Sequence, residues 1–378
     1  MGEWSRRPLG EVVTLQRGHD LPTGSRRFGS VPVIGSFGIT GYHDVAKYRG
    51  PGVAIGRSGA SIGVATWCSD DYWPLNTCLF VSDFHGNDQR WVYYLLHSIE
   101  FERFNSGSAQ PSLNRNYLVN IPIDLPPLPQ QRAIAEVLGA LDDKIEANRN
   151  VGERCDELFQ TLWVRASNGA VPRIPVREVA RLERGLSYHG EGLGSGEPMV
   201  NLANFSSDGR FHRSGIKYYS GPSKEKHWVH RNDLIVANTD LTQRREVLGQ
   251  PALVPLEGAL FSHHLYALRP LPEAPKWILL WLYGALRQRD FRDRVVTFAT
   301  GTTVAALPTD ALLAYEFPYL ADGVGQRWAE DATLLLGLAE RAEMESVALA
   351  ELRDALLPKL LSGELRVRDA ESLVGEAV

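Results

Sequence analysis

The residues with the clearest capacity for chemistry lie in short polar loops that follow apolar, strand-like runs. Arg57, Ser58, Gly59 and Ser61 follow the apolar residues 53–55. Small residues let backbone N–H groups approach a phosphate, and an arginine suits either a phosphate or the edge of a guanine. The segment therefore predicts a contact with nucleic acid. A tight structural turn that carries a surface arginine is the alternative.

A second polar loop covers residues 105–111, and a similar loop lies near residue 300. The first contains Ser106, Gly107, Ser108 and Gln110 and is followed by Arg115. The second contains Thr300, Gly301, Thr302 and Thr303. Short hydroxyl and amide side chains suit base edges or phosphates. Such turns are common in mixed folds, but their equivalent place in the two halves of the chain favours contact with nucleic acid.

The second half of the chain adds a group of basic residues among aromatic ones. These are Lys217, Lys224, Lys226, Arg244 and Arg245, interspersed with Tyr218, Tyr219 and Trp228. Phosphate contact explains such a mixture, and so does an ordinary solvated surface. Arg244 and Arg245 are the stronger candidates because they follow the polar residues 238–240.

No catalytic constellation is recognisable in the sequence. Residues 125–128 read Leu-Pro-Pro-Leu, so they lack the polar and aromatic residues with which adenine methyltransferases hold a flipped base. The phosphate loop of nucleoside triphosphatases and the two-histidine metal motif are absent from the sequence. We expect the adjacent His263 and His264 to point to opposite faces of a strand. The sequence therefore predicts a protein without catalytic residues, metal site or bound cofactor, and an enzyme with an unrecognised site is the weakest alternative.

Composition and charge bound the class of protein. The 378 residues are 44% hydrophobic, enough for two ordinary cores, and the net charge is −5. Residues 1–60 hold eight Lys/Arg against four Asp/Glu, residues 205–250 hold eight against five, and residues 326–378 hold six against eleven. Positive charge thus gathers away from the C-terminal segment. There is no apolar leader, no run of membrane-spanning length and no disulfide framework, so we expect a cytoplasmic protein without a membrane partner.

Two long helical segments must position these loops. The first seam contains Ile134, Leu138, Leu141, Ile145, Asn148, Cys155 and Phe159, and the second contains Leu335, Leu338, Glu345, Leu349, Leu352 and Leu356. Gln131 and Arg132, at the start of the first helix, are further candidates for the seam or for binding a partner. Each seam follows a heptad pattern, which is typical of a helix that packs against one partner helix. A helix of roughly 36 residues is about 54 Å long. We expect the two helices to pair antiparallel. Asn148 and Glu345 would fix the register, unless the helices turn these residues to the surface.

The segments before the helices repeat each other. Trp91-Val92 matches Trp277-Ile278, Gln131-Arg132 matches Gln326-Arg327, and an Arg-Gly pair recurs at residues 17–18 and 184–185, all in the same order. Both segments contain short apolar runs, closely spaced glycine and proline, and one helical patch. The fold class that follows is α+β, with two tandem-duplicated α+β lobes separated by two long helices that form an antiparallel coiled coil.

Several of these features resemble the DNA-specificity (S) subunits of Type I restriction–modification enzymes. The resemblance rests on Leu-Pro-Pro-Leu-Pro-Gln-Gln-Arg at residues 125–132, on the helix that follows, on the terminal Leu-Leu-Pro-Lys-Leu-Leu-Ser-Gly-Glu-Leu at 356–365, and on the order of lobes and helices. It implies the following domains: a first target-recognition domain at 1–125, a central conserved helix at 126–169, a second target-recognition domain at 170–322, and a C-terminal conserved helix and tail at 323–378.

The resemblance also implies a function in phage defence and a set of partners. Each target-recognition domain would read one half of a bipartite site in double-stranded DNA. Two modification subunits would dock on the helices and bring S-adenosylmethionine, and restriction subunits would add ATP- and Mg²⁺-dependent translocation and cleavage. None of that chemistry would lie in this chain. The alternative is an interaction scaffold that binds modification subunits without a functional DNA-reading face.

Overall fold

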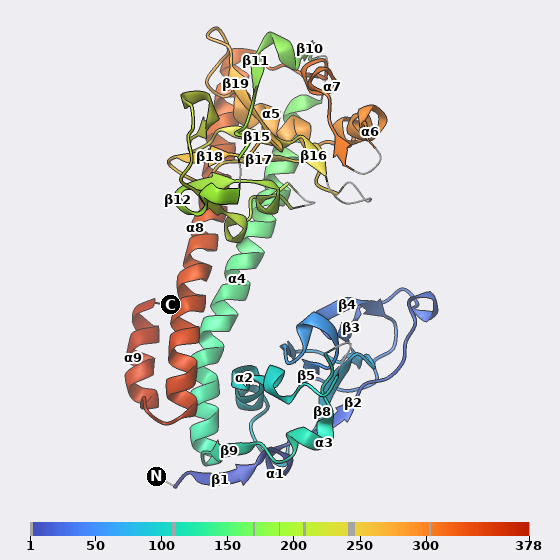
Figure 1. Cartoon of the computed structure of the whole chain (residues 1–378), viewed down its shortest axis with the longest axis vertical. Coiled ribbons are helices and arrows are strands. Elements are labelled where there is room, and N and C mark those ends of the chain that lie inside the picture. The colour runs from blue at the N-terminus through green and yellow to red at the C-terminus, as the bar shows by residue number, and fades with distance from the viewer. Residues whose placement is uncertain are drawn as a thin grey trace. The chain divides into compact units, whose positions relative to one another are not determined.

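The chain divides into two compact units. The computed structural model describes residues 3–107, 111–168, 171–188, 190–206, 209–240, 246–301 and 304–377. Unit 1 combines Met1–Asn150 with Ala342–Val378, and unit 2 is Val151–Arg341. Two 40-residue helices, α4 (Leu128–Ser167) and α8 (Asp322–Leu361), each contribute one half to unit 1 and the other half to unit 2 (Figure 1).

Unit 1 is built on two small sheets and a peripheral strand pair. The first sheet has the order β2-β8-β5-β6 and consists of β2 (Thr14–Arg17), β5 (Gly52–Gly56), β6 (Ala65–Cys68) and β8 (Cys78–Asp83). The second has the order β4-β3-β7 and consists of β3 (Val31–Gly35), β4 (Gly38–His43) and β7 (Trp73–Pro74). The peripheral pair is β1 (Ser5–Pro8) with β9 (Pro122–Leu125). The helices are α1 (Leu9–Val12), α2 (Gln89–Ser98), α3 (Arg115–Leu118) and α9 (Val367–Ala377).

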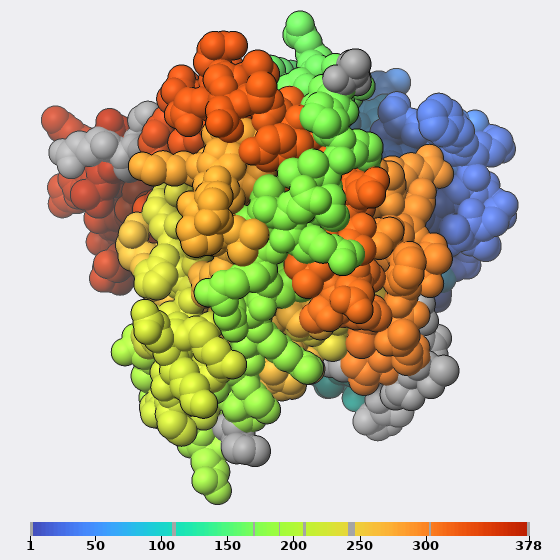
Figure 2. All heavy atoms as spheres, turned by 90° about the horizontal axis from the view of Figure 1, so that it is seen from above, coloured from blue at the N-terminus to red at the C-terminus, as the bar shows by residue number. Residues whose placement is uncertain are grey.

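Unit 2 has two four-stranded sheets. The first has the order β11-β19-β15-β17: β11 (Ala180–Arg184), β15 (Leu234–Ala237), β17 (Pro251–Leu253) and β19 (Leu265–Pro270). The second has the order β13-β12-β18-β14: β12 (Leu193–Val200), β13 (Lys217–Tyr219), β14 (Trp228–Val229) and β18 (Ala259–Phe261). Two strand pairs join β10 (Arg173–Pro175) to β21 (Glu316–Pro318) and β16 (Thr239–Asp240) to β20 (Ala305–Ala306). The helices are α5 (Ile278–Leu286), α6 (Arg289–Phe298) and α7 (Thr309–Leu313). Figure 2 shows green residues of this unit running across one face between its orange segments.

Both units use the same strand connectivity. The first sheet of each unit has four strands. Numbered by their order in the sequence, they lie side by side in the order 1-4-2-3 in both units, and all three pairings are antiparallel. In each second sheet one pairing is parallel, β3 with β7 and β12 with β18. A parallel bridge joins His19 to Leu75 in unit 1 and Leu186 to Ser262 in unit 2. The mixed helix-and-sheet architecture with two long helices is therefore confirmed.

The expected seam of α4 is buried along most of its length. Ile134, Leu138, Leu141 and Asn148 are buried within unit 1, and Cys155 and Phe159 within unit 2. Leucine and isoleucine at steps of three and four residues place their side chains on one helix face, which explains why the period predicted this burial. Arg132 is exposed, and Ile145 is half-buried.

Within unit 1 the two long helices run antiparallel. Arg353 donates to Asp142 at 2.7 Å, and Asn148 donates to Glu345 at 2.7 Å, so the order of contacts along one helix is the reverse of that along the other. Within unit 2 the rings of Phe159 and Trp328 lie 5.6 Å apart, centroid to centroid.

On α8 the expected seam is interrupted at one position. Leu349 and Leu356 are buried, and Leu335 and Leu352 are half-buried, as a seam requires. Leu338 is 44% exposed, so its assignment to the seam is wrong, and Ala339 is the less exposed neighbour. A heptad of alternating steps can be read in two phases that differ by one residue, and the larger side chain at 338 made the wrong phase look better.

A buried glutamine fastens the start of α4 to the lobe of unit 1. The Gln131 amide nitrogen donates to the Asn87 side-chain oxygen and to the Pro126 carbonyl, both at 2.9 Å, and its oxygen accepts from the Asp88 N–H at 2.9 Å. The amide is thus satisfied on both sides, which a buried polar group requires. The matching residue in the repeat, Gln326, is exposed and donates to Glu330 on its own helix. The Gln-Arg repeat therefore has different environments at its two occurrences.

We expect Gln131→Ala to destabilise unit 1 by about 2 kcal/mol, because it leaves the buried Asp88 N–H and Asn87 oxygen without their partner. Thermal unfolding and hydrogen exchange of the Asp88 amide measure the effect. Gln326→Ala is the matched control, with an expected change within about 0.5 kcal/mol. Equal losses of stability in the two variants would contradict a stabilising role of the Gln131 hydrogen bonds.

The contact between Asn148 and Glu345 predicts a coupled pair. Glu345 also lies 3.4 Å from the Lys144 ammonium. Glu345→Leu should cost about 1–2 kcal/mol, because it leaves the Asn148 amide buried and unpaired. Asn148→Leu combined with Glu345→Leu should restore or exceed the native stability, since no unpaired polar group remains. A thermal-unfolding double-mutant cycle measures the coupling, and light scattering detects altered association. Additive losses would show that the two residues act independently.

Candidate nucleic-acid interface

A surface hollow of 480 Å³ in unit 1 collects three of its arginines. Its lining includes Arg17, Arg57, Arg115, Ser106, Ser112 and Asn114, and no carboxylate is among the lining residues. Three cationic groups in one hollow attract a polyanion, and the planar guanidinium suits phosphate and guanine edges. Of the residues expected from the sequence, the structure therefore brings Arg57, Ser106 and Arg115 together.

Arg57 is held in the hollow by its own backbone. Its N–H donates to the Thr77 carbonyl at 3.0 Å, and its carbonyl accepts from the Leu113 N–H at 2.8 Å. The residue before it must be glycine, because a Cβ on Gly56 would lie 2.0 Å from the Ser61 carbonyl oxygen. The Nε of Arg57 is buried and has no hydrogen-bond partner among the described residues. The main chain is thus fixed, and the guanidinium retains hydrogen-bonding capacity for a ligand.

The rest of that loop is used within the protein. Ser58 forms a bridge with Ser112, and the Gly59 N–H donates to the Pro111 carbonyl at 3.0 Å. Gly59 has a φ of +82° and opens a single 3₁₀ turn that ends at the buried Ser61. The expected approach of this loop's N–H groups to a phosphate is therefore not available at Gly59. The loop serves chiefly to present Arg57.

The second loop is closed by an asparagine. The Asn105 side-chain oxygen accepts from the N–H groups of Gly107 and Ser112, both at 2.9 Å, and the Ser106 hydroxyl donates to the Ser112 carbonyl at 3.0 Å. Arg115 follows Asn114, which caps the short helix α3. Ser108 and Gln110 lie outside the described residues.

Arg17 is a member of the hollow that the sequence analysis did not assign to the site. It ends β2, and the next residue is Gly18, where a Cβ would lie 2.1 Å from the Leu75 carbonyl oxygen. Arg184 ends β11 in the same way, followed by Gly185, where a Cβ would lie 2.2 Å from the Ser262 carbonyl oxygen. The recurring Arg-Gly pair was the available signal. It marks the same strand end in both units.

In unit 2 the equivalent strand end carries histidines. The Arg184 Nε donates to the His263 carbonyl at 3.1 Å, and the imidazole rings of His263 and His264 lie 3.9 Å apart. The His264 Nδ1 is 2.7 Å from the Thr239 hydroxyl. Burial, followed by the charges of His263, Arg184 and Lys217, lowers the pKa of His264. Lys217 thus belongs to this cationic group.

The expectation that the two histidines point to opposite faces of a strand is wrong. They occupy the turn between β18 and β19, where strand alternation does not apply. The turn allows both rings to lie on one side.

The remaining candidates in unit 2 are distributed more widely. Lys224 and Lys226 are exposed, and their charges contribute, after burial, to the lowered pKa of His227. Thr300 pairs through its backbone with Ala306, and Gly301 has a φ of +90°. Arg244, Arg245, Thr302 and Thr303 lie outside the described residues.

Arg57 and Asn238 occupy the same main-chain position in their units. The Asn238 N–H donates to the His264 carbonyl at 2.9 Å, and its carbonyl accepts from the Leu307 N–H at 2.8 Å, the pattern seen at Arg57. The side chains differ in use: the Asn238 amide is 2% exposed and donates to the His263 carbonyl. Near the histidines of unit 2, Arg184 and Lys217 are exposed cations, and the position equivalent to Arg57 is structural.

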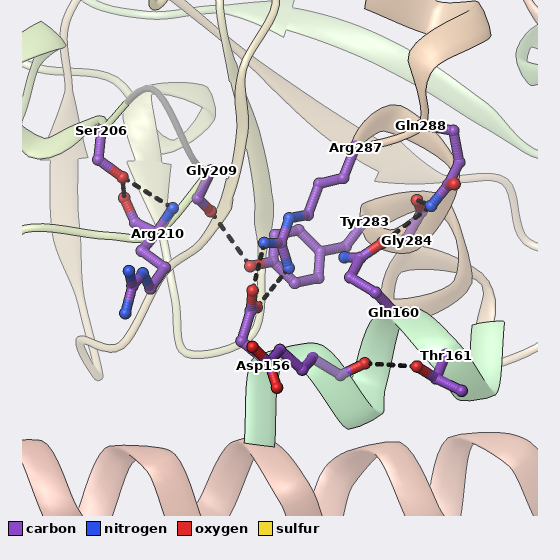
Figure 3. A network of polar contacts seen from close by, with 11 residues as sticks. Asp156, Gln160, Thr161, Ser206, Gly209, Arg210, Tyr283, Gly284, Arg287 and Gln288 are labelled. Atoms are coloured by element: carbon purple, nitrogen blue, oxygen red, sulfur yellow. Dashed lines mark hydrogen bonds and ion pairs between the residues drawn. The ribbon is translucent and has the colours of Figure 1, made fainter. Parts of the chain in front are cut away.

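Charged contacts fix each lobe to its part of the long helices. In unit 2 the Arg287 guanidinium, 7% exposed, donates to both oxygens of Asp156 on α4 at 2.6 and 2.8 Å and lies over the Tyr283 ring (Figure 3). In unit 1 Arg90 on α2 donates to both oxygens of Asp143 on α4 at 2.6 and 3.1 Å. Paired bonds of this kind fix an orientation as well as a distance.

Among the described residues, we also looked for a reactive thiol, a metal site and a membrane-spanning helix. Burial raises the pKa of both Cys68 and Cys78 to about 12, so neither thiol is a ready nucleophile at neutral pH. Within the described ranges, His, Cys, Asp and Glu form no group of three or more that would hold a metal ion. A search of the same ranges finds that no helix has the length and apolar character needed to cross a bilayer.

The chain is similar to known specificity subunits. Residues 1–153 match the family model described as Type I restriction modification DNA specificity domain. The Type I restriction enzyme EcoprrI specificity subunit of Escherichia coli is 26% identical over 145 residues, which are 37% of this chain and 36% of that protein. A putative type I restriction enzyme specificity subunit of Haemophilus influenzae, S.HindORF215P, is 30% identical over 144 residues, 37% of each chain. The matched region thus spans little more than a third of the curated relatives.

A solved structure extends the likeness in fold to nearly the whole chain. The crystal structure of the S subunit of a Type I restriction-modification system from M. genitalium superposes with a TM-score of 0.62 at 17% identity and covers 95% of this chain and 96% of its own. Residues 1–153 are thus similar in sequence to the Type I restriction modification DNA specificity domain, and the fold of nearly the whole chain is similar to that of a solved S subunit.

Proposed function

We propose that this chain reads a bipartite target in double-stranded DNA, with one half-site for each unit. The observation that carries the proposal is the hollow of unit 1, where Arg17, Arg57 and Arg115 lie together and no carboxylate is among the described lining residues. Arg17 and Arg115 are exposed and Arg57 is half-buried, so three positive charges gather on one accessible surface, and a polyanion would relieve their mutual repulsion. The hollow is therefore suited to the phosphates and base edges of DNA.

We further propose that the two lobes arose by tandem duplication and serve equivalent functions. The shared strand order, the Arg-Gly pair at the same strand end, and the shared main-chain hydrogen bonds at Arg57 and Asn238 support this. Different side chains on one main-chain frame would let each unit prefer a different half-site.

The proposed partners are two modification subunits and, in a larger complex, restriction subunits in the cytoplasm. Apolar side chains on the long helices support a docking role, since Val151 and Leu158 on α4 and Met344 and Val347 on α8 are all more than 40% exposed. S-adenosylmethionine, ATP and Mg²⁺ would be bound by the partners. This chain would supply only sequence recognition and assembly.

The first test is salt-dependent binding of labelled duplex DNA by the chain, alone and with purified modification subunits. Methylation profiling of the reconstituted complex identifies the target. We expect the chain to bind the sequence that the complex methylates more tightly than other sequences. Binding should weaken as the salt concentration rises, because phosphate contacts are lost. Binding of modification subunits without any sequence preference would favour the scaffold alternative.

Specificity should be modular. Arg57→Ala should weaken or relax only the first half-site, and Arg184→Ala only the second, by about 1–3 kcal/mol where the arginine contacts a guanine. A phosphate contact would instead weaken all sequences evenly and reduce the salt slope by about one. Binding titrations and methylation profiles of each variant distinguish these results.

Arg7→Ala and Arg289→Ala are the matched controls. Each removes an exposed arginine, one per unit, whose ion pair is with an acidic residue four positions later in the sequence. We expect neither to change target preference. If Arg57→Ala and Arg184→Ala behave like these controls, the two arginines do not contact DNA.

A further inference from the structure

An exposed phenylalanine stands at the tip of the β3–β4 hairpin in unit 1. Phe37 is 78% exposed and lies in the two-residue turn between Gly35 and Gly38, which pair with each other at the end of the ladder. Gly38 has a φ of +85°, which a side chain would strain. Ile39 on the adjoining strand is 55% exposed as well, so the tip of this hairpin offers apolar surface to a ligand.

The tip is held rigidly. A Cβ on Gly35 would lie 2.6 Å from the Thr40 methyl group, so the two strands are close-packed at this point. The Thr40 hydroxyl donates to the Val33 carbonyl at 3.1 Å across the hairpin. Phe37 is thus presented by a fixed turn rather than by a loose loop, and little entropy would be lost when it is bound.

The tip borders the arginine hollow. A Cβ on Gly56 would lie 2.4 Å from the carbonyl oxygen of Ser36, so the turn and the start of the Arg57 loop touch. Gly35 also approaches Thr77, whose carbonyl accepts the Arg57 N–H. Phe37 follows Ser36, and Arg57 follows Gly56. The backbone of the apolar tip therefore contacts the backbone that leads into the cationic hollow of unit 1.

We propose that Phe37 is an apolar wedge that packs against or between base pairs of the first half-site while the hollow holds the flanking phosphates. This inference rests on the proposed function and adds to it a local distortion of the DNA. Apolar side chains flanked by cations are used in this way to unstack a base step. Among the described residues, the lining of the hollow contains three arginines and no carboxylate, which suits the closely spaced phosphates of DNA.

The chain offers a matched control on the same hairpin. Phe28 is fully exposed, but Gly29 packs against the backbone of His43 and Asp44, at the end of the hairpin away from Phe37. Arg27 is paired with Asp44 at 2.7 Å, so the charge beside Phe28 is already neutralised. Phe28→Ala removes the same group without touching the surface that adjoins the hollow.

The experiment uses the full chain assembled with its modification subunits and the duplex that the native complex methylates. 2-Aminopurine is placed in turn at positions of the first half-site other than the methylated adenine. We expect the native complex to raise fluorescence at one step. Phe37→Ala should abolish that signal and weaken binding about 10-fold, as the loss of one base–aromatic contact predicts. Phe37→Leu should retain most of both, and Phe28→Ala should change neither.

Each contrary outcome has a distinct meaning. Unchanged affinity and fluorescence in Phe37→Ala, with the native signal present, would overturn the wedge and leave the DNA-reading proposal intact. A loss of modification-subunit binding with DNA binding unchanged would show that Phe37 faces protein. A native complex without sequence preference would overturn the proposed function itself. Because Phe37 is exposed, its removal should leave thermal unfolding unchanged, which confirms that any loss is one of binding.

Discussion

The apolar seam of α4 supplies core residues to both units, and the two lobes depend on it. Ile134, Leu138 and Leu141 lie in the core of unit 1, and Phe159 and Trp163 lie in that of unit 2. A large-to-small change at a fully buried seam position costs about 2–5 kcal/mol, a large part of the stability of one domain. Neither lobe is therefore complete without its half of the helix. Under the proposed function, in which each unit reads one half-site, a continuous helix shared by both cores would link the two readers.

Charged contacts then convert this packing into a defined orientation. Apolar packing alone tolerates small rotations, whereas Arg90 with Asp143 and Arg287 with Asp156 each fix two donor–acceptor pairs. Replacing only one member of such a partly buried pair leaves its partner uncompensated, which is more costly than replacing both. Gln131 adds a neutral clasp in unit 1 that Gln326 does not reproduce in unit 2. The two lobes thus share a frame but are fastened differently.

The long helices could be predicted from local periodicity. The strand order of the sheets could not, because it depends on pairing between distant residues. The three-and-four spacing from Ile134 onward predicted most buried positions of α4 because helix geometry depends only on neighbouring residues. The order β2-β8-β5-β6 depends on contacts between distant residues, which composition does not reveal. For the same reason Arg57 was recognisable from its own loop, whereas Arg17 joined the hollow only through the folded sheet.

Arg57 and Asn238 place different side chains on the same main-chain frame, which is compatible with the proposed reading of two different half-sites. Their main chains form the same pair of hydrogen bonds, so the backbone is insensitive to the side chain at that position. In unit 1 the side chain is an arginine that enters the hollow. In unit 2 it is a buried asparagine, and the cations at hand are Arg184 and Lys217 beside two histidines. If main-chain hydrogen bonds stabilise the fold at these strand ends, the side chains there can be replaced without loss of the fold, and different side chains can suit different DNA targets. The two half-sites would then differ in sequence while the lobes that read them keep one topology.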